Sequence, residues 1–244
     1  MLLHTSISHQ NADNNKQTEL VLTQKNEFMK KVKIIMIVVL TSAFSLSTRA
    51  QGVSTGLDLV STYVWRGTKL SGPSIQPFLQ YNKNGFTIGS WGSAGFDGFL
   101  EMDLFARYVF NFGLTTGLTD YYFPGTDYFD FSKENGSHGY EINLGYVTHG
   151  FSVGANYMLN EAGGARTAGG DKYFELGYTR KNISIFAGAG DGWHTPTGEF
   201  GVVNLGLSAT KELQISDTFR VPVKLSAILN PTTKQYYLTA GITL

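Results

Sequence analysis

The chain has 244 residues, with 19 Lys and Arg against 19 Asp and Glu, and it contains no cysteine. The lack of cysteine excludes disulfide bonds, thiolate metal sites and a cysteine nucleophile. All 29 glycines lie after residue 50, where 13 basic and 16 acidic residues give a slightly acidic balance that argues against a nucleic-acid partner.

The first fifty residues have the pattern of a targeting segment. A basic stretch begins at Met29, an apolar run follows from Ile34 to Leu46, and small residues stand at Thr48 and Ala50. The run is shorter than the roughly 20 residues that a membrane-spanning helix needs. We therefore predict a signal peptide over residues 29–50, cleaved near Ala50. Residues 1–28 are either an upstream extension of this leader or precede the true translation start at Met29.

Residues 51–244 alternate in polarity, as strands do when their side chains point in turn to two faces. Near the C-terminus Tyr236, Leu238 and Ile242 alternate with polar or small residues, and no stretch has a helical period. Twelve strands are predicted, over residues 53–66, 74–81, 86–93, 99–110, 113–123, 139–148, 151–160, 172–180, 183–190, 201–213, 219–229 and 234–244.

The connections between these segments alternate in length. Residues 82–85, 111–112, 149–150, 181–182 and 214–218 are short, whereas 124–138, 161–171 and 191–200 are long and polar. Short turns that alternate with long loops are typical of outer-membrane barrels. We therefore expect an all-β fold, an antiparallel up-and-down transmembrane β-barrel of about 12 strands over residues 51–244. It would lie in the outer membrane of a Gram-negative bacterium with both termini in the periplasm, and a soluble sandwich is the structural rival.

Aromatic residues gather near the ends of several predicted strands. They are Tyr63 and Trp65, Trp91, residues 121–123, Phe110 with Phe112, and Tyr146 with Phe151. Aromatic rings favour the headgroup level at both faces of a bilayer, which predicts two aromatic girdles. The alternative is that aromatic residues simply favour strands.

Several short motifs resemble those of a known family. They are Ser61-Thr62-Tyr63-Val64-Trp65-Arg66-Gly67, Ile75-Gln76-Pro77, Gly89-Ser90-Trp91-Gly92-Ser93, Glu101-Met102-Asp103 and Glu141. Together they resemble the TorF-like porins of Gram-negative bacteria over nearly all of residues 51–244. The resemblance implies an outer-membrane barrel that conducts small solutes, and it implies no particular substrate or mechanism.

Charged residues of both signs fall on the inner face of the predicted barrel. By strand parity, nine of them are expected to line a pore: Asp58, Arg66, Glu101, Asp103, Arg107, Glu141, Glu175, Arg220 and Lys224. Such side chains set the barrier that a crossing solute meets. We expect opposite charges to pair across a narrow lumen, with weak ion preference, and Arg66 to meet Glu101. A single bulge would reverse the parity beyond it.

Three functions stay open at this point. They are passive diffusion of small hydrophilic solutes, a closed barrel with a structural or loop-mediated binding role, and a lipid-modifying outer-membrane enzyme. We predict the first, with no catalytic residue, metal site or cofactor. The expected partners are outer-membrane lipid, the solutes and the barrel-assembly machinery, without nucleic acid.

The enzyme alternative requires a nucleophile such as a serine paired with a histidine. His149 lies in a short turn, and His138 and His194 lie in long loops without an evident nucleophile. Asp127 and Asp130 with Glu134 lack the glycine-centred spacing of a calcium loop, which favours a solvated acidic loop.

Overall fold

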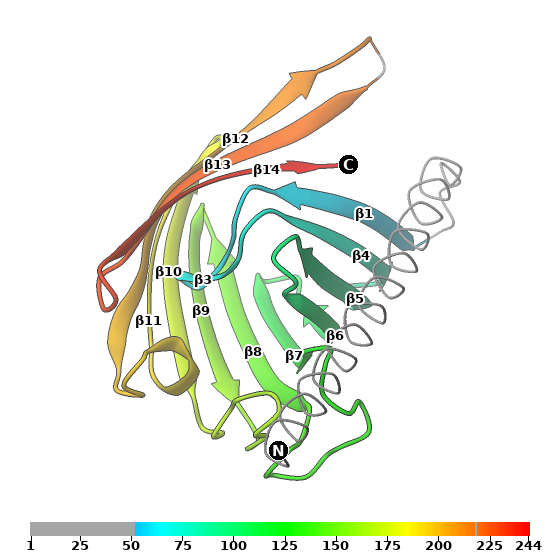
Figure 1. Ribbon diagram of the computed structural model, residues 1–244. Helices are drawn as coiled ribbons and strands as arrows, with labels where there is room; N and C mark the ends of the chain where they lie inside the picture. Colours follow the sequence, from blue (N-terminus) through cyan, green and yellow to red (C-terminus); the bar gives the residue numbers. More distant parts are fainter. Residues whose placement is uncertain (1–51, 218) are drawn as a thin grey trace, which may run out of the picture. The chain divides into compact units, whose positions relative to one another are not determined.

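The alternating segments of the sequence form the wall of a β-barrel in the computed structural model, which describes residues 52–217 and 219–244 (Figure 1). Each wall strand pairs antiparallel with its neighbours along the chain, which confirms the predicted closed barrel of twelve strands. The wall consists of β1 (Val53–Val60), β4 (Ser74–Lys83), β5 (Phe86–Gly95), β6 (Leu100–Val109), β7 (Leu114–Tyr122), β8 (His138–Thr148), β9 (Phe151–Met158), β10 (Lys172–Arg180), β11 (Ile183–Gly190), β12 (Gly201–Gln214), β13 (Arg220–Asn230) and β14 (Gln235–Thr243).

The barrel closes where the first wall strand meets the last. Asp58 of β1 stands opposite Thr243 of β14, and Leu57 and Leu244 exchange two backbone hydrogen bonds of 3.1 and 2.9 Å. On its other side β1 pairs with β4 along its whole length. The seam is short, because β1 and β14 pair only at Asp58, Leu59 and Val60. The other wall strands pair with a neighbour on both sides, as a barrel in lipid requires.

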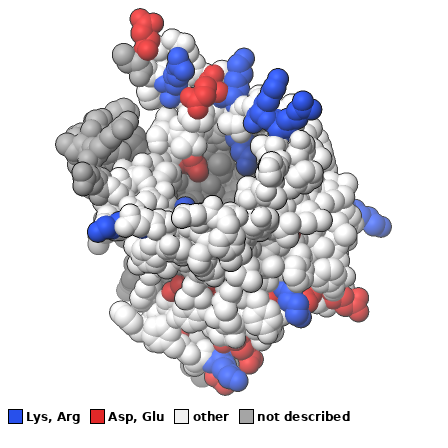
Figure 2. All heavy atoms as spheres, turned by 180° about the vertical axis from the view of Figure 1, so that it is seen from behind, with Lys and Arg blue, Asp and Glu red and all other residues white. Residues whose placement is uncertain are grey.

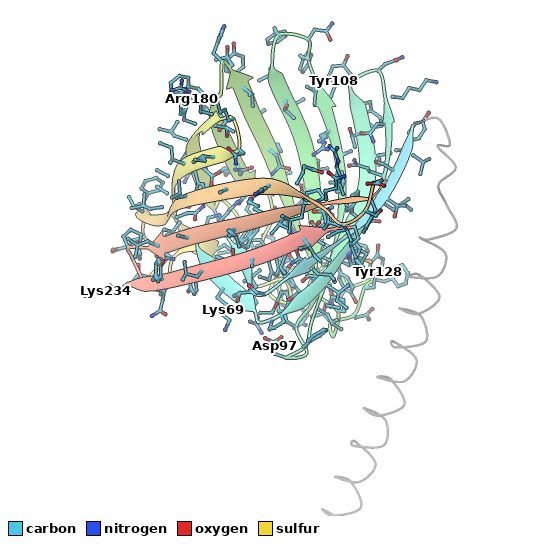
Figure 3. All side chains as sticks on the ribbon, turned by 90° about the horizontal axis from the view of Figure 1, so that it is seen from above. Lys69, Asp97, Tyr108, Tyr128, Arg180 and Lys234 are labelled. Carbon is cyan, nitrogen blue, oxygen red and sulfur yellow. The ribbon has the colours of Figure 1, made fainter. Side chains whose placement is uncertain are left out.

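The connections give the barrel two different ends. At the short-turn end, Asn84-Gly85 and His149-Gly150 have positive φ at both residues, the backbone of a two-residue hairpin turn. We call the opposite end the long-loop end. The longer connections between wall strands lie there, over residues 61–73, 123–137, 159–171 and 191–200. Figure 3 shows Tyr108 and Arg180 at the short-turn end and Lys69, Asp97, Tyr128 and Lys234 at the other.

The outer face of the wall is apolar. Leu104 on β6, Leu176 on β10 and Leu238 on β14 are 43%, 61% and 68% exposed, and similar side chains recur on the remaining strands. A continuous exposed surface of this kind is far larger than soluble proteins tolerate. It is what a barrel surrounded by lipid requires.

The inner face is polar, and toward the short-turn end it is open. A cavity of about 350 Å³ lies there, and Thr115, Thr119, Asn143, Gly145 and Asn156 are among the residues that line it. Figure 2 shows the hollow from behind, with side chains of both charge signs along its upper rim. This part of the barrel interior therefore has room for water.

The predicted first strand is wrong beyond Val60. The chain leaves the wall there and forms a separate two-stranded hairpin of β2 (Tyr63–Trp65) and β3 (Thr68–Ser71) before it returns at Ser74. Within the described residues the one helical element is the short 3-10 helix η1 (Gly192–His194), and none is long and apolar enough to cross a membrane. The predicted leader over residues 1–28 and 29–50, with its cleavage near Ala50, lies outside the described residues.

The aromatic residues predicted to form two girdles face outward at the short-turn end but inward at the long-loop end. Phe112, Tyr146 and Phe151 are 64%, 41% and 59% exposed at the short-turn end, where a girdle would place them. Tyr63 and Trp91, however, meet inside the barrel, with ring centroids 5.5 Å apart. Trp65 and Tyr121 also pack inside it, 5.7 Å apart.

Candidate functional site: a hairpin folded into the lumen

The β2–β3 hairpin turns back through Arg66 and Gly67. Both residues have positive φ, 47° and 81°, and they connect the paired residues Trp65 and Thr68. This is the geometry of a two-residue hairpin turn, in which glycine is favoured at the second position. The hairpin lies inside the ring of wall strands in Figure 1, so its turn points into the lumen. We call residues 63–71 the plug hairpin.

Arg66 fastens the plug hairpin to the far wall. Its Nη1 and Nη2 atoms donate to Oε1 and Oε2 of Glu141 on β8, at 2.6 and 2.8 Å. The Tyr121 hydroxyl and the Asn143 amide donate to Oε2 of the same carboxylate, at 3.0 and 2.7 Å. The Glu141 side chain is 1% exposed and that of Arg66 13% exposed. Two parallel charged hydrogen bonds fix both distance and orientation, which a lysine at position 66 would not do.

Aromatic rings surround the same guanidinium group. Its central carbon lies 4.5 Å from the ring centroids of both Trp65 and Tyr173. Its Nη1 atom is 3.5 Å from Nε2 of His194 in η1. Burial and the Arg66 charge lower the pKa of His194 to about 3. The imidazole is therefore neutral at ordinary pH and adds no second positive charge beside Arg66.

The tip of the plug hairpin presses against β12 and β13. The buried side-chain amide of Asn230 donates to the Gly67 carbonyl oxygen, at 3.1 Å. A Cβ atom at position 67 would collide with the carbonyl oxygen of Val203, which is itself fully buried. The hairpin thus spans the lumen from β1 and β4 to β8, β10, β12 and β13.

The other eight predicted pore residues lie on wall strands, on the face opposite the exposed apolar side chains. Asp58 accepts a hydrogen bond from Thr243 at 2.6 Å, and Glu175 accepts one from Tyr173 at 2.5 Å. Glu101 and Asp103 are 5% and 8% exposed. In each of these two carboxylates one buried oxygen has no hydrogen-bond partner.

The predicted basic residues occupy a different level of the barrel. Arg107, Arg220 and Lys224 are exposed and lie near the short-turn ends of β6 and β13. Glu101, Glu141 and Glu175 instead lie within four residues of the long-loop ends of β6, β8 and β10.

The expected pairing of opposite charges across the lumen is therefore wrong in all but one case. Among the described residues, the one ion pair that joins two of the nine predicted residues is Arg66 with Glu141. Arg66 meets Glu141 rather than Glu101, because the turn of the plug hairpin carries it past β6 to β8.

Several residues of this site were missed by sequence reasoning. Tyr121 and Trp91 share strand parity with polar or small residues such as Thr119 and Ser93, and this signal could have placed them inside. Trp193 and His194 lie in a loop, where parity gives no information. No alternation of polar and apolar residues in this loop indicates that Trp193 and His194 pack against Trp65 inside the barrel.

The ring nitrogens of His138 face a carboxylate and a backbone carbonyl group. Nδ1 of His138 faces Asp120 at 2.9 Å, but Nε2 faces the Tyr128 carbonyl oxygen at 2.6 Å rather than a hydroxyl group. Over residues 52–217 and 219–244 there is no group of three or more His, Asp or Glu side chains that could hold a metal ion.

Comparisons with known proteins give a family and several similar structures. No curated protein matches the sequence. Among solved structures, a mutant of the Rh. blastica porin is 13% identical, with 80% of this chain and 73% of that chain covered and a TM-score of 0.42. An outer membrane channel from Pseudomonas putida is also 13% identical, over 79% of this chain and 94% of that chain, with a TM-score of 0.38. The outer membrane protein OprD from Pseudomonas aeruginosa is 9% identical, over 81% and 65%, with a TM-score of 0.35.

These similarities say nothing about solute or mechanism, and the TorF-like resemblance of the motifs stays a prediction. A family model matches residues 46–217, which is most of the sequence. The chain therefore belongs to the Gcw_chp family, described as bacterial proteins of unknown function.

Proposed function

We propose that the protein is an outer-membrane channel for small hydrophilic solutes in which the plug hairpin forms the constriction. The observation that carries this proposal is the contrast between the two halves of the lumen. The short-turn half holds a cavity lined by polar residues such as Arg107, Thr119 and Asn143. The long-loop half is crossed by the hairpin that Arg66 fastens to Glu141. Twelve strands stand between barrels of eight, which side chains fill, and open channels of about sixteen.

The outer face supports a location in the outer membrane of a Gram-negative bacterium. Its exposed apolar side chains need lipid, and only closed barrels and helices satisfy every backbone group there. In this arrangement the short turns face the periplasm and the long loops face outward. Insertion by the barrel-assembly machinery and export by a signal peptide over residues 29–50 belong to the same proposal.

The nine charged residues act at two levels in this proposal. Glu101, Asp103, Glu141 and Glu175 surround the constriction with Arg66, and Arg107, Arg220 and Lys224 border the wider part. Asp58 lies at the seam of the barrel, between Gln76 of β4 and Thr243 of β14. A solute would therefore meet acidic groups at the narrow level and basic groups near the periplasmic opening.

Recordings from the purified protein in a planar bilayer test this function. Discrete conductance steps are expected, because water and ions need a continuous path through the barrel. The control is that the same protein shows the heat-dependent gel mobility of a folded barrel. If such protein gives no conductance steps in several salts, the proposed channel function is contradicted.

The Arg66 to Glu141 contact also favours a second function, a closed barrel whose loops bind a partner. Undocking the hairpin would separate this buried bidentate ion pair and leave the Glu141 carboxylate without its charged partner, which opposes opening of the lumen. Such a barrel would give silent recordings while folding normally, so the same experiment separates the two functions.

A further inference from the structure

A cavity of about 480 Å³ lies at the long-loop end, on the plug hairpin. Aromatic side chains dominate its wall, namely Trp65, Phe99, Tyr121, Phe123 and Trp193. They pack edge to face, with Trp65 and Tyr121 5.7 and 5.6 Å from Trp193. The volume is in the range of small-molecule sites, which are mostly apolar with a few placed polar groups.

The polar group placed in this cavity is Glu101. It lines the cavity wall, it is 5% exposed, and its buried Oε2 atom accepts no hydrogen bond. Asp103, two residues further along the same face of β6, also has a buried oxygen without a partner. The Tyr63 hydroxyl interacts with the Glu101 carboxylate, but the Oε2 atom is left without a partner. A buried carboxylate oxygen without a partner is costly, so the site favours a ligand that supplies positive charge or hydrogen-bond donors.

The protein itself does not supply that charge. Arg66 is the buried cation nearest to this region, and both of its terminal nitrogens are engaged by Glu141. Arg166 also lines the cavity, but it is exposed to solvent. Two inward carboxylates are thus left without a basic partner among the described residues.

We infer that this cavity binds a small organic cation, with Glu101 as its counter-ion and the aromatic wall around its apolar part. Tryptophan and tyrosine rings attract ammonium and quaternary ammonium groups through their faces. The described residues hold no cluster of three metal-ligating side chains, which favours an organic cation over a metal ion. The site faces the long-loop end and does not depend on conduction, so a closed barrel could also contain it.

The tryptophans provide a direct measurement. The chain has three, of which Trp65 and Trp193 line the cavity and Trp91 packs below it against Tyr63. Choline would be titrated into the folded protein in maltoside micelles while tryptophan emission is followed. Its uncharged isostere, 3,3-dimethylbutanol, and MgCl2 at matched ionic strength would be titrated in parallel.

Choline is expected to change the emission saturably, and the neutral isostere to bind at least about tenfold more weakly. Glu101→Gln, which keeps the side-chain size, is expected to weaken choline binding by a similar factor. Glu199→Gln removes the same charge from an exposed loop position and should bind as the unmodified chain does.

Four results would overturn the inference. They are no saturable response to choline, equal binding of the isostere, equal binding by Glu101→Gln, and a response to MgCl2 that matches the response to choline. Because binding is measured without a bilayer, a silent channel recording and a failed titration are separate outcomes.

Discussion

Arg66 and Glu141 lie 75 positions apart in the sequence and meet inside the barrel through two charged hydrogen bonds of 2.6 and 2.8 Å. The contact joins a hairpin that has left the wall to a strand on the opposite side. It is the ion pair that fastens the plug hairpin, and it places the Arg66 side chain, which is 13% exposed, inside the barrel. Breaking it should therefore change conduction without removing the barrel.

Arg66→Ala is expected to weaken docking of the plug hairpin by about 3 to 5 kcal/mol, because the Glu141 carboxylate is left buried without its partner. The undocked hairpin should produce more frequent or larger conductance steps in a planar bilayer. Lys69→Ala removes one positive charge from an exposed position of the same hairpin and should leave the recording unchanged.

The pair can also be tested for coupling. Arg66→Ala combined with Glu141→Gln should cost less than the sum of the two single changes, since neither partner is then left as an isolated buried charge. Additive effects on the unfolding midpoint and on conduction would contradict a direct link between these residues.

Gly67→Ala should loosen the tip of the hairpin. The added methyl group meets the Val203 carbonyl oxygen, and alanine is also strained at a φ of 81°. Gly98→Ala is a matched control, because Gly98 has a φ of 96° but no atom within 4 Å of the added carbon. Backbone strain alone costs about 1 to 3 kcal/mol, so the midpoint of urea unfolding should fall further for Gly67→Ala than for Gly98→Ala.

His194 should make stability depend on pH. Burial, with Arg66 nearby, lowers the pKa of His194 from 6.5 to about 3 in the folded protein. Below pH 6.5 the unfolded chain therefore binds a proton that the folded protein does not, and stability falls as the pH falls.

The expected loss between pH 7 and pH 5 is about 2 kcal/mol, measured as a shift of the free energy of unfolding in urea. His194→Gln should lose less stability over the same interval. His149→Gln, in an exposed turn, should keep the pH dependence of the unmodified chain.

His138 should hold the loop at residues 123–137 in place. One ring nitrogen lies 2.9 Å from Asp120 and the other 2.6 Å from the Tyr128 carbonyl oxygen, so the ring links β7 to this loop. The glutamine side chain cannot reach both partners with the same geometry, so His138→Gln should release the loop. Faster trypsin cleavage after Lys133, which is 76% exposed, would report the release.

Glu161→Gln is the control for this experiment. It removes the surface contact of Glu161 with Lys133, in which the atoms are 3.9 Å apart. Exposed pairs of this kind contribute little, so cleavage should be unchanged. Equal cleavage of the His138→Gln and unmodified chains would contradict the role assigned to His138.

The sequence predicts a strand and the direction of its side chains where polar and apolar residues alternate along the whole strand. Leu100 to Val109 alternates so regularly that both the strand and the inward position of Glu101, Asp103 and Arg107 could be predicted from parity. The tight turns at Asn84-Gly85 and His149-Gly150 were also predictable, because few residues accept their positive φ.

The plug hairpin was not predictable in the same way. Residues 53–66 continue to alternate beyond Val60, so parity alone gives one long strand. Tertiary contacts hold Tyr63 to Trp65 away from the wall. They follow the turn at Arg66-Gly67 and join the hairpin to Glu141 and Asn230 on distant strands. Such contacts depend on the closed barrel and leave no local periodicity.

The central claim, a channel constricted by the plug hairpin, is tested most directly by removing the hairpin. Val60 and Ser74 are paired residues of β1 and β4, so residues 61–73 can be replaced by a two-residue Asn-Gly turn without changing the wall register. Single-channel recordings of this variant should show conductance steps several-fold larger than those of the unmodified chain. A folded variant that stays silent, or whose steps are the same size as those of the unmodified chain, would contradict the account.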